Sequence, residues 1–280
     1  MSAFARHARY VIGENPVTAL AAGLFALLVA LALVGPFVAP HDPLLSDTAR
    51  KLEPPSARHW FGTDQIGRDV LSRVIWGGRV SLVVGIVPVI LSAVAGTSVG
   101  LVAGYYGGIL DHIMTRSLDV LFAFPAILLA LTIVSALGPS IYNAMLAITI
   151  VAVPSFARLV RSSVLAVRAR SFVEAAASLG ASRRRIIMRH ILPNTVSPVI
   201  VYGTFETGKT IVFAAALSFL GLGVQPPTAE WGAMLSEGRT VLATAWHVAT
   251  VPGLVIFLVS LSFNVLGDGL RDVLDPRRTA

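Results

Sequence analysis

The sequence predicts an all-α, polytopic membrane protein with about six transmembrane helices. Hydrophobic residues make up 55% of its 280 residues, charged residues only 13%, and the mean hydropathy is +0.77. Soluble domains carry about a quarter charged residues. A transmembrane helix needs about 20 mostly apolar residues, and runs of this kind recur along the whole chain. Composition and patterning therefore exclude an ordinary soluble domain.

Six apolar runs account for the predicted spans. They cover residues 17–39, 80–104, 120–137, 141–158, 196–222 and 248–267. The first run follows Arg6 and Arg9, as the core of a signal peptide would. It is longer than the roughly 7–15 apolar residues of such a core, so we expect a retained span. Pro125 interrupts the third run.

A long polar segment separates the first two runs. Its apolar residues that share one helical face are Ile66, Val70, Leu71, Val74 and Ile75. The opposite face is polar, which predicts an amphipathic helix over residues 65–76 on the membrane surface. Its polar residues are Arg68, Asp69, Ser72 and Arg73. We expect Asp64 to cap this helix and Gly77–Gly78 to end it.

The polar segment also sets the predicted domain organisation. Residues 1–79 form an N-terminal part with the first span, and residues 80–280 form a core with the other five spans. Asp64 and Asp69 could be mistaken for a catalytic or metal-binding pair. Turn and cap residues with Arg68 as a partner are the better interpretation, because such residues are common at helix starts.

A basic, helix-prone loop over residues 159–194 lies between the fourth and fifth runs. Glu, Ala and Leu before Gly180 favour a helix, and glycine takes the left-handed cap conformation without a Cβ penalty. Ser182 can cap a second short helix, which Pro193 is expected to end. The loop therefore predicts a helix, a tight turn and a second helix.

The distribution of arginine predicts the orientation. Eight arginines on and beside this loop, against the single acid Glu174, place it in the cytoplasm: Arg158, Arg161, Arg168, Arg170, Arg183, Arg184, Arg185 and Arg189. The N-terminus and the C-terminus, with Arg277 and Arg278, then lie on the same side. Arg183 to Arg185 sit at the positive end of their helix, which predicts an external acidic partner or lipid headgroups.

Several kinds of site are not expected. The net charge of +7 is explained by cytoplasmic loops, so we expect no nucleic-acid partner. The chain has no cysteine and no phosphate-binding P-loop motif, and its six histidines are scattered. We therefore predict no catalytic, cofactor-binding or metal-binding residues in this chain.

Two charged residues fall inside the fifth run. Glu206 and Lys209 are three residues apart, a spacing that makes them neighbours on a helix. Charge at membrane depth is costly and commonly functional. Two interpretations stay open, a self-paired couple facing a subunit interface and a pair that lines the translocation path.

The basic loop resembles a known family signature. Glu174-Ala175-Ala176, Gly180 and Leu192-Pro193, at this spacing, resemble the EAA loop of bacterial ABC-importer permeases. His190 departs from it, because a branched apolar residue is common there. Other stretches resemble the dipeptide/oligopeptide/nickel branch of that family: Phe61–Asp64, Gly67–Asp69, Arg79–Leu82, Leu217–Pro227 and Phe263–Arg277. A glutamate common in that branch before Leu217 is absent, and alanines stand there.

The resemblance implies a fold and partners. It implies a type I importer permease, N-in and C-in, in the bacterial cytoplasmic (inner) membrane. The implied partners are a second homologous permease subunit, two ATPase subunits that hold ATP and Mg, and an extracytoplasmic substrate-binding protein. The implied ATPase-coupling residues are Glu174, Ala175, Ala176, Gly180, Arg183, Arg184, Arg185, His190 and Pro193. Candidate receptor contacts are Asp64, Arg68, Asp69 and Trp231.

The solute is the least determined part of the prediction. Small peptides are the expected cargo, and nickel, glutathione or another small solute are alternatives within the same architecture. An ion-coupled secondary carrier is a different class, in which Glu206 would be the coupling carboxylate. An intramembrane hydrolase is disfavoured, because no Ser/Lys, Ser/His or His/Glu constellation lies at membrane depth.

Overall fold

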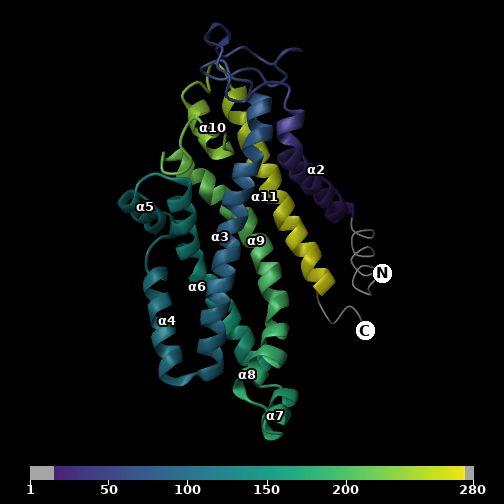
Figure 1. The fold of residues 1–280 in the computed structure, drawn as a ribbon, viewed down its shortest axis with the longest axis vertical. Coiled ribbons are helices and arrows are strands. Elements are labelled where there is room, and N and C mark those ends of the chain that lie inside the picture. Colours follow the sequence, from purple (N-terminus) through teal and green to yellow (C-terminus); the bar gives the residue numbers. More distant parts are fainter. Residues whose placement is uncertain (1–15, 275–280) are drawn as a thin grey trace.

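The computed structural model describes residues 16–274 as one elongated helical bundle (Figure 1). Its helices are α2 (Pro16–Val38), α3 (Val70–Tyr106), α4 (Gly108–Phe122), α5 (Ala126–Leu137), α6 (Ile141–Arg168), α7 (Ser171–Ser178), α8 (Arg183–Ile186), the π-helical turn η2 (Ile187–Ile191), α9 (Leu192–Phe219), α10 (Trp231–Arg239) and α11 (His247–Leu274), with a 3-10 turn η1 (Thr48–Arg50) in the segment after α2. The predictions about Arg6, Arg9, Arg277 and Arg278 lie outside the described residues.

The spans agree with the predicted architecture. Four helices, α2, α3, α6 and α11, are long and apolar enough to cross a membrane, and α4 with α5 forms a fifth candidate, bent by 86°. The bend lies at Pro125, where the sequence predicted an interruption. α9, which carries Glu206 and Lys209, is not among these candidates, but its 28 residues run through the bundle between α3 and α11. With α9 the described spans number six.

The predicted surface helix over residues 65–76 is wrong. A single 37-residue helix, α3, begins at Val70 and continues through Gly77 and Gly78. Its cap is Asp69 and not Asp64, because Asp69 Oδ2 accepts a hydrogen bond of 2.8 Å from Ser72 N. The predicted boundary at residue 79 therefore falls inside a helix.

The two glycines serve close packing. A Cβ added to Gly78 would lie 3.2 Å from the ring of Trp231 and 3.3 Å from the side chain of Ala32. A Cβ at Gly77 would lie 3.2 Å from the Ala229 carbonyl. Glycine lets neighbouring backbones approach in this way inside a membrane bundle.

A seam of glycines joins α3 to α6. Gly96, Gly100 and Gly104 recur every four residues on one face of α3. A Cβ at Gly100 would lie 2.5 Å from the carbonyl oxygen of Ala157, and one at Gly104 would lie 2.9 Å from Val164 Cβ. Association in lipid depends on such close contact, because lipid tails are as apolar as the helices themselves.

Ion pairs and apolar clusters fix the remaining helices. Arg161 on α6 donates two hydrogen bonds of 2.6 Å to Asp111 on α4. At the outer end, α3, α9, α10 and α11 share a buried cluster around Val70, Ile211, Trp231, Ile256 and Val259. At the inner end, α6 and the following hairpin share Val160, Val164, Val167, Val173, Ile186 and Ile191.

The structure also corrects the predicted helix end at Pro193. This proline lies in the first turn of α9, where its missing N–H group would have had no helical partner. The chain passes from α8 through η2 into α9 without leaving the helical region.

Candidate functional site

A helical hairpin, α7 and α8, occupies the extreme inner end of the bundle, opposite the segment that follows α2 (Figure 1). Gly180 takes φ +81°, and the N–H group of Ala181 donates to Ala176 O at 3.1 Å, which closes the end of α7. Ser182 then caps α8, because its hydroxyl oxygen accepts from Arg185 N. The predicted helix, turn and second helix are confirmed.

The hairpin is anchored on one side. Val173 and Ile186 are 5% and 4% exposed and contact the α6 valines of the inner cluster. Arg168 at the end of α6 donates a hydrogen bond of 2.8 Å to Tyr105 O at the end of α3. The hairpin is therefore packed on the inner end of α6, which Arg168 links to the end of α3.

The other side of the hairpin is exposed. Glu174 and Ala175 are exposed, and Leu179 and Met188 leave 88% and 57% of their surface uncovered. The three consecutive arginines, 183 to 185, are also exposed. The hairpin thus leaves both large apolar side chains and positive charge uncovered in this chain.

The remaining predicted coupling residues are spread around the hairpin. Ala176 is half-buried, Pro193 is exposed, and the ring of His190 lies 6.2 Å from the ring of Phe172. A cavity of about 480 Å³ opens at the base of the hairpin. Its lining includes Tyr105, Tyr106, Arg168, Glu174, Ala177 and Arg183.

The two charged residues of α9 form a close pair. Lys209 Nζ lies 3.1 Å from Glu206 Oε1, so the neighbour relation predicted from their spacing is confirmed. Glu206 is 8% exposed, whereas 69% of the Lys209 side chain is exposed beside a small recess that Ile148 and Phe213 help to line. An ammonium group cannot remain in lipid without a large cost, so Lys209 faces a partner helix or an aqueous path.

The outer end is closed by an ionic network of which the sequence predicted only the partnership of Arg68 with the aspartates. We call the segment of residues 39–69 together with α10 the outer cap. Asp64 Oδ2 accepts hydrogen bonds of 2.6 Å from Arg68 Nε and from Arg73 Nη1. Arg68 Nη2 also lies 2.8 Å from Glu237 on α10. Four charged groups from three segments therefore hold the outer cap on α3.

The predicted receptor contacts do not fit this arrangement. Asp64, Arg68, Asp69 and Trp231 are each at most 6% exposed, because they hold the outer cap together. The interpretation of Asp64 and Asp69 as turn and cap residues with an Arg68 partner is confirmed. The large accessible side chains of this end are others, among them Trp60 and Trp246, which are 69% and 58% exposed.

The carboxyl group of Glu237 is electrostatically perturbed by its place in the outer cap. Burial raises the pKa of its carboxyl group. The positive charge of Arg68 acts in the opposite direction, and the negative charge of Asp64 adds to the rise. Desolvation thus outweighs the ion pair at this position.

Comparison with known proteins identifies the family. Residues 96–280 match the family described as "Binding-protein-dependent transport system inner membrane component". The chain belongs to this family. The six-span architecture and the inner hairpin are accordingly those of an importer permease. Residues 39–69 of the outer cap lie upstream of the matched region, and α10 lies within it.

Similar permeases come from enterobacteria. The chain is 49% identical over 261 residues to a protein of Pectobacterium atrosepticum named "Glutathione transport system permease protein GsiD", a match that covers 92% of this chain and 87% of that one. It is 50% identical, over 92% of this chain and 86% of the relative, to proteins of the same name from Escherichia coli and Shigella boydii.

Solved structures agree on the fold. A structure titled "Inward facing conformations of the MetNI methionine ABC transporter" matches with a TM-score of 0.60 at 18% identity, over 72% of this chain and 97% of that one. A second match is titled "Crystal structure of an amino acid ABC transporter with histidines", with a TM-score of 0.53 at 18% identity, over 71% of this chain and 92% of that one. The type I permease fold is thereby established.

The family defines what the chain does in general terms. It is the permease subunit of an ABC importer in the bacterial inner membrane, and separate ATPase subunits hydrolyse ATP. Its partners are ATPase and substrate-binding proteins. This assignment replaces the two other classes considered above, the ion-coupled carrier and the intramembrane hydrolase.

Proposed function

We propose that this permease moves small peptides of the glutathione class into the cytoplasm. The supporting observation is the identity of 49–50% over 92% of the chain with permeases named for glutathione transport. Such peptides carry carboxylates, and the exposed ammonium group of Lys209 beside the recess on α9 offers a matching cation. The proposal keeps small peptides as the cargo and narrows them to peptides that resemble glutathione.

Uptake into vesicles tests the cargo. The assembled importer is placed in liposomes with its binding protein outside and ATP inside. Labelled glutathione, a neutral dipeptide and Ni²⁺ are then offered separately. We expect ATP-dependent accumulation of glutathione above that of the other two. Accumulation of Ni²⁺ or of the dipeptide without glutathione uptake would replace the proposed class.

We further propose that the α7–α8 hairpin is the coupling element. The exposed side of the hairpin, with Glu174, Ala175 and Leu179, docks against an ATPase subunit. The three arginines meet acidic residues around that contact. Closure of the ATPases on ATP pulls the hairpin, and its anchors carry the displacement to α3 and α6. The assembly consists of this chain, a second homologous permease, two ATPase subunits and an external binding protein.

Substitution of an exposed alanine tests the coupling proposal. Ala175→Trp adds bulk on the exposed side of the hairpin without changing the buried anchors Val173 and Ile186. The permease should therefore fold, while ATPase subunits are lost on purification. Ala243→Trp, at an exposed position beyond α10, is the matched control and should retain them. Native mass spectrometry of the complex reads both results and the stoichiometry. Full retention and full uptake with Ala175→Trp would overturn the assignment.

A further inference from the structure

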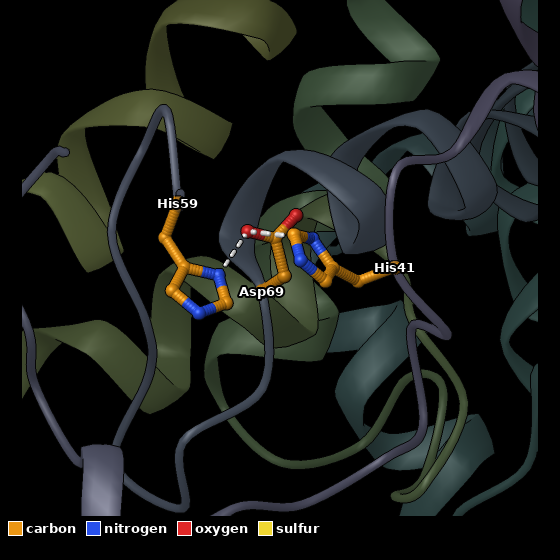
Figure 2. A group of neighbouring side chains, drawn as sticks. All are labelled: His41, His59 and Asp69. Atoms are coloured by element: carbon orange, nitrogen blue, oxygen red, sulfur yellow. Dashed lines mark hydrogen bonds and ion pairs between the residues drawn. The ribbon is translucent and has the colours of Figure 1, made fainter. Parts of the chain in front are cut away.

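Two histidines and an aspartate that are distant in the sequence meet in the outer cap. Figure 2 shows the carboxylate of Asp69 between the imidazole rings of His41 and His59. His59 Nδ1 lies 2.8 Å from Asp69 Oδ1, and His41 Nδ1 lies 3.7 Å from the same oxygen. The three ligand atoms all fall within 4.8 Å of one another. The scattered histidines of the sequence gave no sign of this grouping.

The two oxygens of Asp69 have separate roles. Oδ2 accepts hydrogen bonds of 2.8 Å from Ser72 N and 2.7 Å from Ser72 Oγ, which fix the carboxylate at the start of α3. Oδ1 is left to face the two imidazoles. Ser72 Oγ also accepts from the backbone N of His41 at 3.0 Å, so one serine holds both the Asp69 carboxylate and the His41 backbone. Metal-binding carboxylates and histidines are oriented by such hydrogen bonds.

The nitrogen of His41 is the observation that points to a ligand. Its Nδ1 atom is buried and has no hydrogen-bond partner, since 3.7 Å to Asp69 is too long for a hydrogen bond. A buried polar atom without a partner is costly and calls for an explanation. A cation seated among the three ligand atoms would satisfy His41 Nδ1 and Asp69 Oδ1 together.

The two separations measured from Asp69 Oδ1 are close to those expected around a small divalent ion. Zinc binds histidine nitrogen at about 2.0–2.1 Å and carboxylate oxygen at about 2.0–2.2 Å, so two of its tetrahedral ligands lie about 3.4 Å apart. The observed separations of 2.8 and 3.7 Å from Asp69 Oδ1 stand on either side of that value. The two rings lie side by side, with centroids 4.7 Å apart and planes inclined by 32°.

We propose that His41, His59 and Asp69 bind a divalent transition-metal ion, Zn²⁺, at the outer end of the permease. Two imidazoles with one carboxylate are ligands that zinc uses widely. Binding replaces the hydrogen bond between His59 Nδ1 and Asp69 Oδ1 and fastens His41 and His59 of the outer cap to the start of α3. The site does not depend on which solute the permease carries.

Metal content tests the site. The assembled importer, purified with a tag that contains no histidine, is stripped with a chelator, supplied with Zn²⁺ alone and desalted. Zinc per permease chain is then measured by elemental mass spectrometry. We expect one more zinc ion per chain in the unmodified protein than in His41→Gln, His59→Gln or Asp69→Asn. His112→Gln, an exposed histidine on α4 at the other end, is the matched control and should lose none.

Thermal stability gives a second measurement. Zn²⁺ should raise the Tm of the unmodified protein and of His112→Gln in a concentration-dependent manner, because it binds only the folded cap. His41→Gln removes a ring that makes no hydrogen bond, so this variant should fold and show no zinc-dependent rise. Equal zinc content in all variants, or an equal rise of Tm with His41→Gln, would overturn the proposal.

Discussion

Neutralising Asp64 tests the physical account of the outer cap. Asp64→Asn keeps an oxygen that can accept from Ile66 N and Arg68 N, but it removes the charge that two guanidinium groups share. Arg68 and Arg73 are then left with Glu237 as their remaining acidic partner in the network. Because Arg73 is 1% exposed, water cannot replace the lost carboxylate.

The magnitude follows from the burial of the pair. Breaking a buried ion pair by removing one partner costs about 3–5 kcal/mol. Glu237 retains part of the attraction, so we expect the lower figure, about 3 kcal/mol. For a protein of this size that corresponds to a fall in Tm of about 6–12 °C.

The assay is thermal unfolding of the purified permease in detergent, followed by tryptophan fluorescence. Asp47→Asn is the matched control, because Asp47 pairs with Arg50 at 3.4 Å on an exposed part of the outer cap. That substitution should shift Tm by less than about 2 °C. Equal shifts for the two aspartate variants would refute the reasoning, since burial would then contribute nothing to the strength of the Asp64 network.

Three further outcomes are expected. Gly100→Ala should disrupt the contact of α3 with α6 and destabilise the permease by about 1–3 kcal/mol. Gly23→Ala is the control and should be tolerated, because a Cβ added at Gly23 would meet no atom within 4 Å. Equal Tm values for the two variants would contradict the packing role of the glycine seam. Because the pKa of Glu237 is raised in the folded state, its stabilising contribution is present at acidic pH and is lost as pH rises through that pKa. The Tm of the unmodified protein minus that of Glu237→Gln should therefore decrease as pH rises. An increase would mean that ion pairing dominates. Lys209→Gln should reduce uptake of an anionic peptide at least tenfold, and unchanged transport kinetics would remove Lys209 from the path.

Local signals in the sequence were sufficient for the inner hairpin. Gly180 and Ser182 act on residues within a few positions of themselves, so the turn and the cap follow from chemistry that the sequence displays directly. The apolar runs likewise predicted the spans, because lipid imposes one simple requirement of length and composition.

Long-range partners explain what the sequence could not supply. Ser72 and Arg73 made residues 65–76 look like a surface helix, since polar residues on one face usually meet water. In the structure that face meets Asp69 and Glu237, and the second of these is more than 160 positions away. The grouping of His41 with His59 has the same origin, because only the folded outer cap brings them together.

The length of α3 has a mechanical consequence. At about 1.5 Å per residue its 37 residues extend about 55 Å, well beyond the roughly 30 Å of hydrocarbon. One continuous rod thus joins the Asp64 network at one end to Tyr105 and Tyr106, beside the hairpin, at the other. A tilt of about 5° moves its far end by about 5 Å. Pro88 lies at the middle of α3 and cannot donate a helical hydrogen bond, so the helix bends most easily at this residue.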